Sequence, residues 1–223
     1  MGGGLMQLVA YGAQDIYLTG NPQITFFKVV YRRHTNFAVE SIEQTFNGQA
    51  DFGKRVTATI SRNGDLIQQM YLEAVLPNVT GGGSGTTWTY GVGNAMINKA
   101  EIEIGGQLID RHYGDWMNIW TELTVPADKR AGYDNMVGNW VNNDHGAQWS
   151  GVAANNGTFK LYVPLQFWFN RNPGLALPLI ALQYHEVKLN LELRSLPDLL
   201  TSESVSAGIY SGTPVGSLDC KLY

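Results

Sequence analysis

Apolar and polar residues alternate along several short segments of this chain. Residues 187–194 show the pattern most clearly, with four apolar positions separated by polar ones. Residues 55–61 and 159–163 repeat it, and Pro164 ends the second of these because proline cannot donate to a strand ladder. A period of two is that of a β-strand with one buried face and one face in water. The alternation therefore predicts strands that cover a core on one side only.

Two adjacent glycines, Gly105 and Gly106, separate two more strand-like segments, residues 101–104 and 107–110. Both glycines can take positive φ, which a two-residue hairpin turn requires. We therefore expect a tight β-hairpin here. A longer apolar-rich run, residues 66–76, is expected to be a further strand.

Helix signals are few. One apolar stripe has the helical spacing i, i+3, i+4, i+7, and it consists of Trp116, Ile119, Trp120 and Leu123. Asp115 can cap the start of this helix, and Pro126 ends it or opens a following turn. We expect both tryptophans of the stripe to lie in the core. Residues 175–182 and 195–200 are expected to form short helical turns.

Three segments rich in Gly, Asn or Ser lie between the predicted strands: residues 78–93, 138–157 and 201–217. Long loops joined to short strands are typical of a jelly roll, in which strands form the wall and loops make contacts. The 223 residues suit one large all-β domain or two small ones. We predict an all-β fold: an antiparallel jelly-roll β-sandwich with short helices inserted in loops.

Charge is low and unevenly placed. Charged residues make up 15% of the chain and the net charge is −4, so electrostatics do not favour direct binding of nucleic acid. Residues 1–62 carry six Lys/Arg and four Asp/Glu, whereas the remainder is acidic. This asymmetry is either ordinary scatter or a basic end that faces an anionic layer or an acidic partner.

The chain contains one cysteine, Cys220, so the fold does not depend on an intramolecular disulfide. It lies on the apolar face of a predicted strand, where a small buried hydrophobe is expected. The chain has no signal-peptide pattern and no apolar run of 18 residues. These features favour assembly in a reducing compartment.

No pattern points to catalysis. The four histidines, His34, His112, His145 and His185, lack metal-ligand spacing. No Gly-x-Ser-x-Gly elbow or phosphate-binding loop occurs. Glu101 and Glu103 share the wet face of a strand and are expected to be solvated rather than to form a catalytic pair. We predict no enzyme activity, no cofactor, and no catalytic, cofactor-binding or metal residue.

Two tripeptides match the glycan acceptor pattern, Asn78-Val79-Thr80 and Asn156-Gly157-Thr158. Both are expected on surface loops. Asn78 and Asn156 are therefore candidate modification sites, although the tripeptide is common and a cytosolic protein does not meet the secretory transferase.

The N-terminal segment does not have a helical period. Gly12, Gly20 and Pro22 interrupt it, and an aromatic and basic stretch at residues 26–34 closes it. We predict that residues 1–37 form an arm that lies along other surfaces, and that residues 38–223 form the folded domain.

Several short sequence segments then point to one family. They are QLVAYG (7–12), DIYLTG (15–20), PQITFF (22–27), YRRHTNF (31–37), IEIGG (102–106) and HYGDWM (112–117). The match is long and nearly without gaps, and it fades after about residue 197. The chain resembles the N-terminal portion of major capsid proteins of the nucleocytoplasmic large DNA viruses.

The resemblance implies the first roll of a double jelly-roll capsid protein. Such proteins trimerise into pseudo-hexameric capsomers that tile the icosahedral shell of a large DNA virus. The implied partners are the homotrimer, neighbouring capsomers, minor capsid proteins and the internal viral membrane. The implied location is the virion, after assembly in the host cytoplasm. Residues 218–223 alternate like a strand and then stop, so we expect the chain to be a fragment that lacks the second roll.

The resemblance also gives the arm a role beneath the capsomer. Apolar anchors and charges for such contacts are Phe26, Phe27, Lys28, Tyr31, Arg32 and Arg33. Two alternatives remain open from the residues. Loop tryptophans (Trp88, Trp140 and Trp149) suit a carbohydrate-binding jelly-roll module. A cupin-type enzyme would need clustered ligands, for which only His145 and His185 are candidates.

Overall fold

The computed structural model describes residues 36–80, 86–139, 159–202, 213–215 and 217–223. The chain divides into two units, residues 1–40 and residues 41–223. The predicted arm, residues 1–37, lies almost entirely outside the described residues, so its boundary stays a prediction. The description below concerns the second unit.

Short strands dominate this unit. They are β1 (Phe46–Asn47), β2 (Arg55–Thr59), β3 (Leu66–Ile67), β4 (Tyr71–Leu76), β5 (Asn78–Thr80), β6 (Thr86–Trp88), β7 (Ile97–Ile104), β8 (Gln107–His112), β9 (Phe159–Pro164), β10 (Leu177–Pro178), β11 (Val187–Leu193), β12 (Leu200–Ser202), β13 (Thr213–Val215) and β14 (Asp219–Leu222). The helices are α3 (Val92–Met96), α4 (Gly114–Thr124) and α5 (Ala127–Val137), with 3-10 turns η1 (Trp168–Asn170), η2 (Pro173–Leu175), η3 (Leu179–Leu182) and η4 (Leu196–Leu199).

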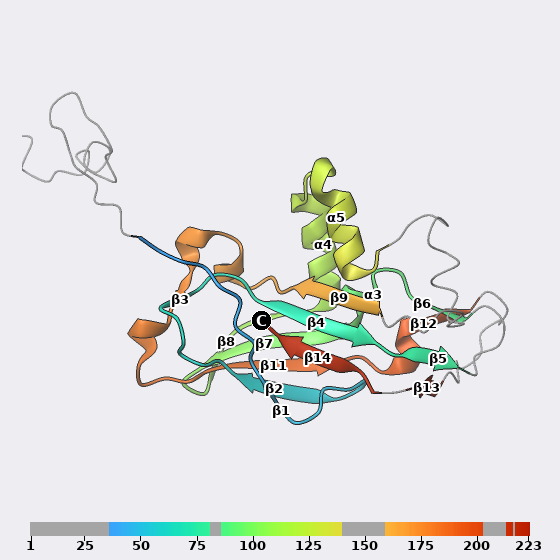
Figure 1. The fold of residues 1–223 in the computed structure, drawn as a ribbon, viewed down its shortest axis with the longest axis horizontal. Helices are drawn as coiled ribbons and strands as arrows, with labels where there is room; N and C mark the ends of the chain where they lie inside the picture. The colour runs from blue at the N-terminus through green and yellow to red at the C-terminus, as the bar shows by residue number, and fades with distance from the viewer. Residues whose placement is uncertain (1–35, 81–85, 140–158, 203–212, 216) are drawn as a thin grey trace, which may run out of the picture. The chain divides into compact units, whose positions relative to one another are not determined.

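Two sheets form the sandwich (Figure 1). The larger sheet has the order β1-β2-β11-β7-β8 and the smaller has the order β14-β4-β9, and all their pairings are antiparallel. The strand order mixes segments far apart in the sequence, which is the signature of a rolled sheet rather than a meander. The all-β fold class predicted from the alternation is confirmed.

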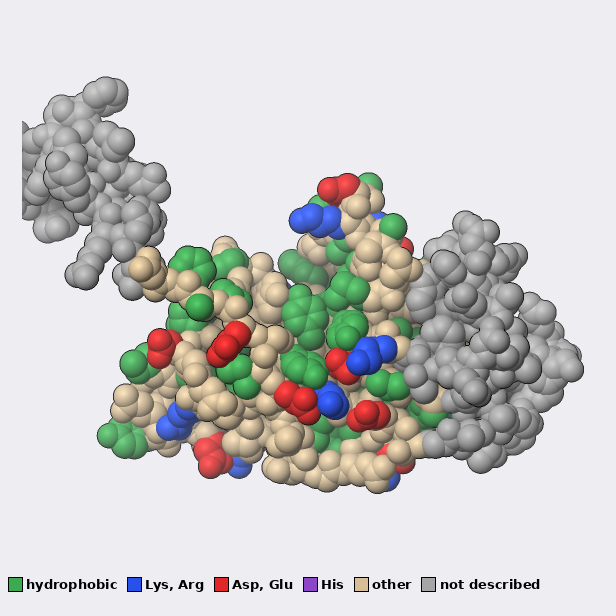
Figure 2. All heavy atoms as spheres, in the orientation of Figure 1, with side chains coloured by type: hydrophobic (Ala, Val, Ile, Leu, Met, Phe, Trp, Pro, Cys, Tyr) green, Lys and Arg blue, Asp and Glu red, His purple; other side chains and the backbone are tan. Residues whose placement is uncertain are grey.

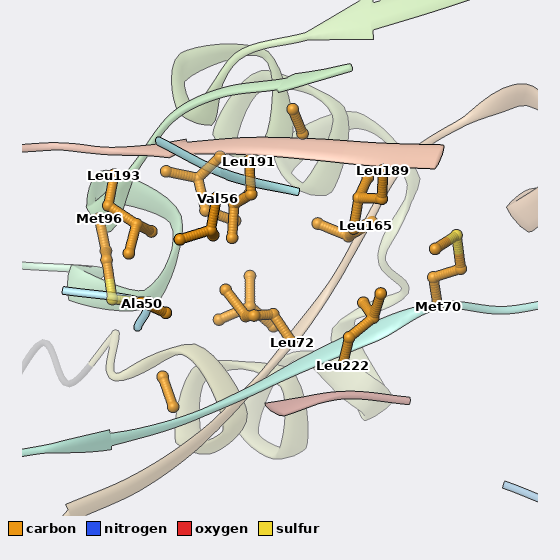
Figure 3. Close-up of a cluster of buried hydrophobic side chains, with 14 of the residues drawn as sticks. Ala50, Val56, Met70, Leu72, Met96, Leu165, Leu189, Leu191, Leu193 and Leu222 are labelled. Atoms are coloured by element: carbon orange, nitrogen blue, oxygen red, sulfur yellow. The ribbon is translucent and has the colours of Figure 1, made fainter. Parts of the chain in front are cut away.

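The core lies between the two sheets. Leu72 and Leu222 come from the smaller sheet, and Val56, Leu189 and Leu191 face them from the larger one (Figure 3). All five are at most 3% exposed. Burying each such side chain contributes about 1.5–3 kcal/mol, so these strands hold the sandwich together through their alternating positions.

The predicted hairpin is confirmed. β7 and β8 pair on either side of Gly105 and Gly106, whose φ angles are 61° and 82°. Positive φ at both central residues is what a type I′ turn demands, and only glycine adopts it without strain. The ladder then shifts register between Ile102 and Glu103.

Other segments differ from the prediction. The run at residues 66–76 splits into β3 and β4, and the predicted loop at residues 78–93 contains β5, β6 and the start of α3. β5 pairs with β13, and β6 pairs with β12. Because each strand has only three residues, its alternation is too short to detect in sequence.

The helical turns expected at residues 175–182 and 195–200 are confirmed as parts of η2 and η3 and as η4. The described residues contain no helix that is both long and apolar enough to span a membrane.

Candidate functional site

Reactive groups do not gather in the described part of the chain. Those residues include no group of three or more His, Cys, Asp or Glu that could hold a metal ion. His112 is buried and His185 is exposed, whereas His34 and His145 lie outside the described residues. Burial raises the pKa of the Cys220 thiol to about 12, as expected for an inert, partly buried cysteine.

Two depressions on the described part of the surface are open. One, of about 620 Å³, is open and is lined mainly by polar groups, including Asn98, Glu192 and Arg194. Ligand sites are normally concave and mostly apolar.

The most distinctive surface feature is a helical hairpin, formed by α4 and α5, that stands out from the sandwich above β9 (Figure 1). α4 was predicted, and it ends at Thr124, before Pro126, after which α5 begins. α5 was missed, because its sequence, ADKRAGYDNMV, has few apolar positions and buries only Val137.

The apolar stripe of α4 faces outward, contrary to the prediction that it packs in the core. Ile119 is 54% exposed and Leu123 is 75% exposed, and Trp116 and Trp120 are only half-buried. Figure 2 shows hydrophobic side chains gathered on the hairpin and across β9. We call Trp116, Ile119, Trp120 and Leu123 the α4 stripe.

The buried face of α4 is instead formed by Gly114, Met117 and Thr121. This face is small, so the helix lies close to α3 and β7. A Cβ at Gly114 would lie 2.2 Å from the backbone oxygen of Asn94 and 2.5 Å from that of Ile97. The prediction that Asp115 caps the helix is wrong. Asp115 lies in the first turn, and its carboxylate is 3.3 Å from the guanidinium of Arg194.

Hydrogen bonds fix the hairpin to the sandwich. Asn94 of α3 is 1% exposed, and its amide donates to Asn118 at 2.7 Å and to the Tyr133 hydroxyl at 3.0 Å. Thr121 also donates to the Tyr133 hydroxyl, at 2.9 Å. The cluster joins α3, α4 and α5, so the α4 stripe is carried on a rigid support.

Charge pairs close the outer end of the hairpin. Arg130 of α5 bridges Glu122 of α4 and Asp134 of its own helix. The hydrogen bond from Arg130 lowers the pKa of Glu122 and raises that of Arg130. The guanidinium of Arg171 lies 4.4 Å from the ring centroid of Trp120. Both carboxylates on α4, Asp115 and Glu122, thus have basic neighbours, and the stripe itself is uncharged.

The outer face of the larger sheet carries an ion network. Glu101, expected to be solvated, is 3% exposed. Its carboxylate lies 3.1 Å from Arg55, 2.6 Å from Arg111 and 3.5 Å from Lys99. The hydrogen bond to Glu101 raises the pKa of Arg111. Basic side chains from β2, β7 and β8 therefore surround the carboxylate.

Most of the other residues predicted for contacts or modification lie outside the described residues, and Asn78 and Trp88 lie in settings other than the predicted loops. The arm residues Phe26, Phe27, Lys28, Tyr31, Arg32 and Arg33 lie outside the described residues, as do Asn156, Trp140 and Trp149. Asn78 lies in β5 instead of a loop, opposite Val215 of β13. Trp88 is 8% exposed and stacks on Phe52, so it is not a free loop aromatic.

Comparison with known proteins places this geometry in context. The family model described as "Major capsid protein N-terminus" matches residues 25–217. The major capsid protein of Phaeocystis pouchetii virus is 55% identical over 236 residues, covering 96% of this chain and 45% of the relative. That of Paramecium bursaria Chlorella virus 1 is 57% identical over 195 residues, covering 87% and 41%.

Solved structures of virus capsid proteins are also similar to this chain. A chain of the structure titled "PBCV-1 virus capsid, quasi-atomic model" has a TM-score of 0.68 at 43% identity, covering 89% of this chain and 44% of that one. The Faustovirus major capsid protein shares the fold alone, with a TM-score of 0.56 at 13% identity, covering 96% of this chain and 57% of that one. The chain spans about half the length of the curated relatives it matches.

Proposed function

The chain belongs to the major capsid protein family, and we propose that it acts as a structural subunit that tiles the icosahedral shell of a large DNA virus. This family is one of structural capsid proteins and not of enzymes. The observation that carries the proposal is the 55% identity to a major capsid protein across 96% of the chain. The same comparisons give no support to the carbohydrate-binding alternative.

The physical task of such a subunit is to present many geometrically matched contacts. A rigid wall and an exposed apolar surface on a fixed support suit that task. We propose that the α4 stripe contacts a neighbouring copy of the protein in the shell. Aromatic side chains are enriched in the buried centres of interfaces, and Trp116 and Trp120 would supply that centre.

The apolar character of the α4 stripe favours a neighbouring copy of the protein as its binding partner. The α4 stripe carries no charge of its own. Arg130 pairs with Glu122 on the same helical hairpin, and the guanidinium of Arg171 lies over the Trp120 ring. An apolar partner of matching shape therefore suits it better than an anionic one. In a shell built from repeated subunits, the surface most often available is that of another copy.

The finer features of the assembly are part of the same proposal. Copies would form trimers with a pseudo-hexameric outline, and these capsomers would pack side by side. The arm would run beneath the capsomer, where its aromatic residues (Phe26, Phe27 and Tyr31) act as anchors and its basic residues (Lys28, Arg32 and Arg33) pair with minor capsid proteins or the internal membrane. Assembly would take place in the host cytoplasm.

Quantitative mass spectrometry of purified virions tests the shell role. A shell subunit is needed in many copies, so peptides of this chain should be among the most abundant in the particle. Infectious virions that contain none of these peptides would contradict the proposal.

A further inference from the structure

A buried imidazole lies at the junction between the sandwich and the helical hairpin. His112 is the last residue of β8, two positions before α4 begins, and it is 4% exposed. The backbone N–H of Gln166 donates to its Nε2 at 3.5 Å. Its Nδ1 has no hydrogen-bond partner among the described residues. The ring packs edge-on against Phe167, with 4.4 Å between centroids.

This geometry accommodates only a neutral ring. Because Nε2 accepts a hydrogen bond, the single proton of the neutral imidazole belongs on Nδ1. A second proton would bind Nε2 and turn the acceptor into a donor that faces the N–H of Gln166. The hydrogen bond would be lost, and a cation would be left in an apolar site.

The charged groups around the ring do not offset the cost of burying the protonated imidazole. Asp110, on the same strand, favours protonation, whereas Arg171, beyond η1, opposes it. The neighbouring strand β7 places Ala100 opposite the ring, and residues 166–170 bring no charge. Burial is the largest influence and lowers the pKa of His112 to about 4.

The segment that contacts His112 also reaches α4 through Arg171. Leu165, Phe167 and Phe169 are at most 1% exposed, and the two phenylalanine rings stack with 5.8 Å between centroids. The segment ends in Arg171, whose guanidinium lies over Trp120 of α4. Trp120 in turn lies 5.7 Å from Trp116. Residues 165–171 therefore link the end of β8 to the aromatic pair of α4.

We propose that His112 is an acid-sensitive latch, in which protonation of Nε2 releases residues 165–171 from β8 and withdraws Arg171 from the ring of Trp120 on α4. The latch follows from the geometry of the single chain, and it holds whether or not the α4 stripe contacts another copy. If the stripe does so, acidification alters the contact surface that one subunit offers to the next.

Unfolding in urea at pH 7.5 and pH 5.0 tests the latch, with His112→Gln as the variant and His185→Gln, which removes an exposed imidazole, as the matched control. A histidine of pKa 6.5 in the unfolded chain and about 4 in the fold raises the unfolding equilibrium constant about 30-fold between these pH values. The wild type and His185→Gln should show this extra factor, and His112→Gln should lack it. An equal pH dependence in all three proteins would overturn the proposal.

Hydrogen exchange at pH 7.5 and pH 5.0, corrected for the intrinsic pH dependence of exchange, tests the local consequence. Amides of residues 165–171 should lose protection at pH 5.0 in the wild type and keep it in His112→Gln. Unchanged protection of this segment in the wild type would overturn the release step. If His112→Gln does not fold, an NMR titration of the wild-type imidazole decides the matter: a pKa near 4 supports the latch, and one near 6.5 overturns it.

Discussion

Gly114 of α4 lies so close to the backbone carbonyl of Asn94 that a Cβ there would be 2.2 Å from the oxygen. This contact brings the N-terminal end of the hairpin against α3 and the first residues of β7. It also determines which face of α4 is buried, since only a residue without a Cβ fits at this position.

Replacing Gly114 with alanine should destabilise the fold by about 2–4 kcal/mol, because backbone must move to accept the methyl group. Urea unfolding measures the change. The matched control is Gly132→Ala in α5, where nothing lies within 4 Å of the added Cβ. That change should stabilise the chain by about 0.5–1 kcal/mol through helix propensity. Equal effects at the two sites would refute the close packing of α4.

Glu101→Gln should destabilise the fold by about 1–3 kcal/mol. The substitution removes the charge shared by Arg55, Arg111 and Lys99 and leaves three cations close together. Thermal or urea unfolding at neutral pH measures the loss. Glu186→Gln serves as the control, because Glu186 is exposed and pairs with the half-exposed Lys188, so a change within about 0.5 kcal/mol is expected. A Glu101→Gln protein as stable as the control would show that the network contributes nothing.

Charge placed on the α4 stripe should weaken self-association. Ile119→Asp and Leu123→Asp each put a carboxylate where an apolar contact is proposed, and about a tenfold or greater loss of affinity is expected. Sedimentation over a concentration series provides the measurement. Ile180→Asp, at a 62% exposed apolar position on η3, is the matched control and should leave association unchanged. Association that survives both stripe substitutions would place the contact elsewhere.

Deleting residues 2–37 should leave the sandwich folded and impair shell assembly. Described core residues such as Leu72, Leu189 and Leu222 come from the strands of the second unit, so we expect the core to form without the arm. Circular dichroism and thermal unfolding report on folding, and electron microscopy of particles reports on assembly. If the deletion unfolds the domain, the arm belongs to the core and its proposed role is wrong.

The strands that form the walls could be predicted from sequence because their signal is local. The sequences of β2, β9 and β11 alternate between apolar and polar residues, and the Gly105-Gly106 turn predicts the hairpin between β7 and β8. The three-residue strands β5, β6, β12 and β13 could not be predicted in this way, because their pairing depends on partners more than 100 residues away.

The side that α4 buries was also beyond local reasoning. Its apolar stripe has the spacing of a core-facing helix, and in most globular domains it would be buried. The available signal was Gly114, since a glycine early in a helix costs stability unless a close approach requires it. The burial of Glu101 likewise depends on register, because Arg111 becomes its neighbour only through the pairing of β7 with β8.

A density map of assembled particles is the most direct test of the claim that this protein is a repeated shell subunit. The map should show the sandwich at equivalent positions throughout the shell, with the α4 stripe of each copy covered by its neighbour. Particles whose shell is built from another protein would contradict the claim.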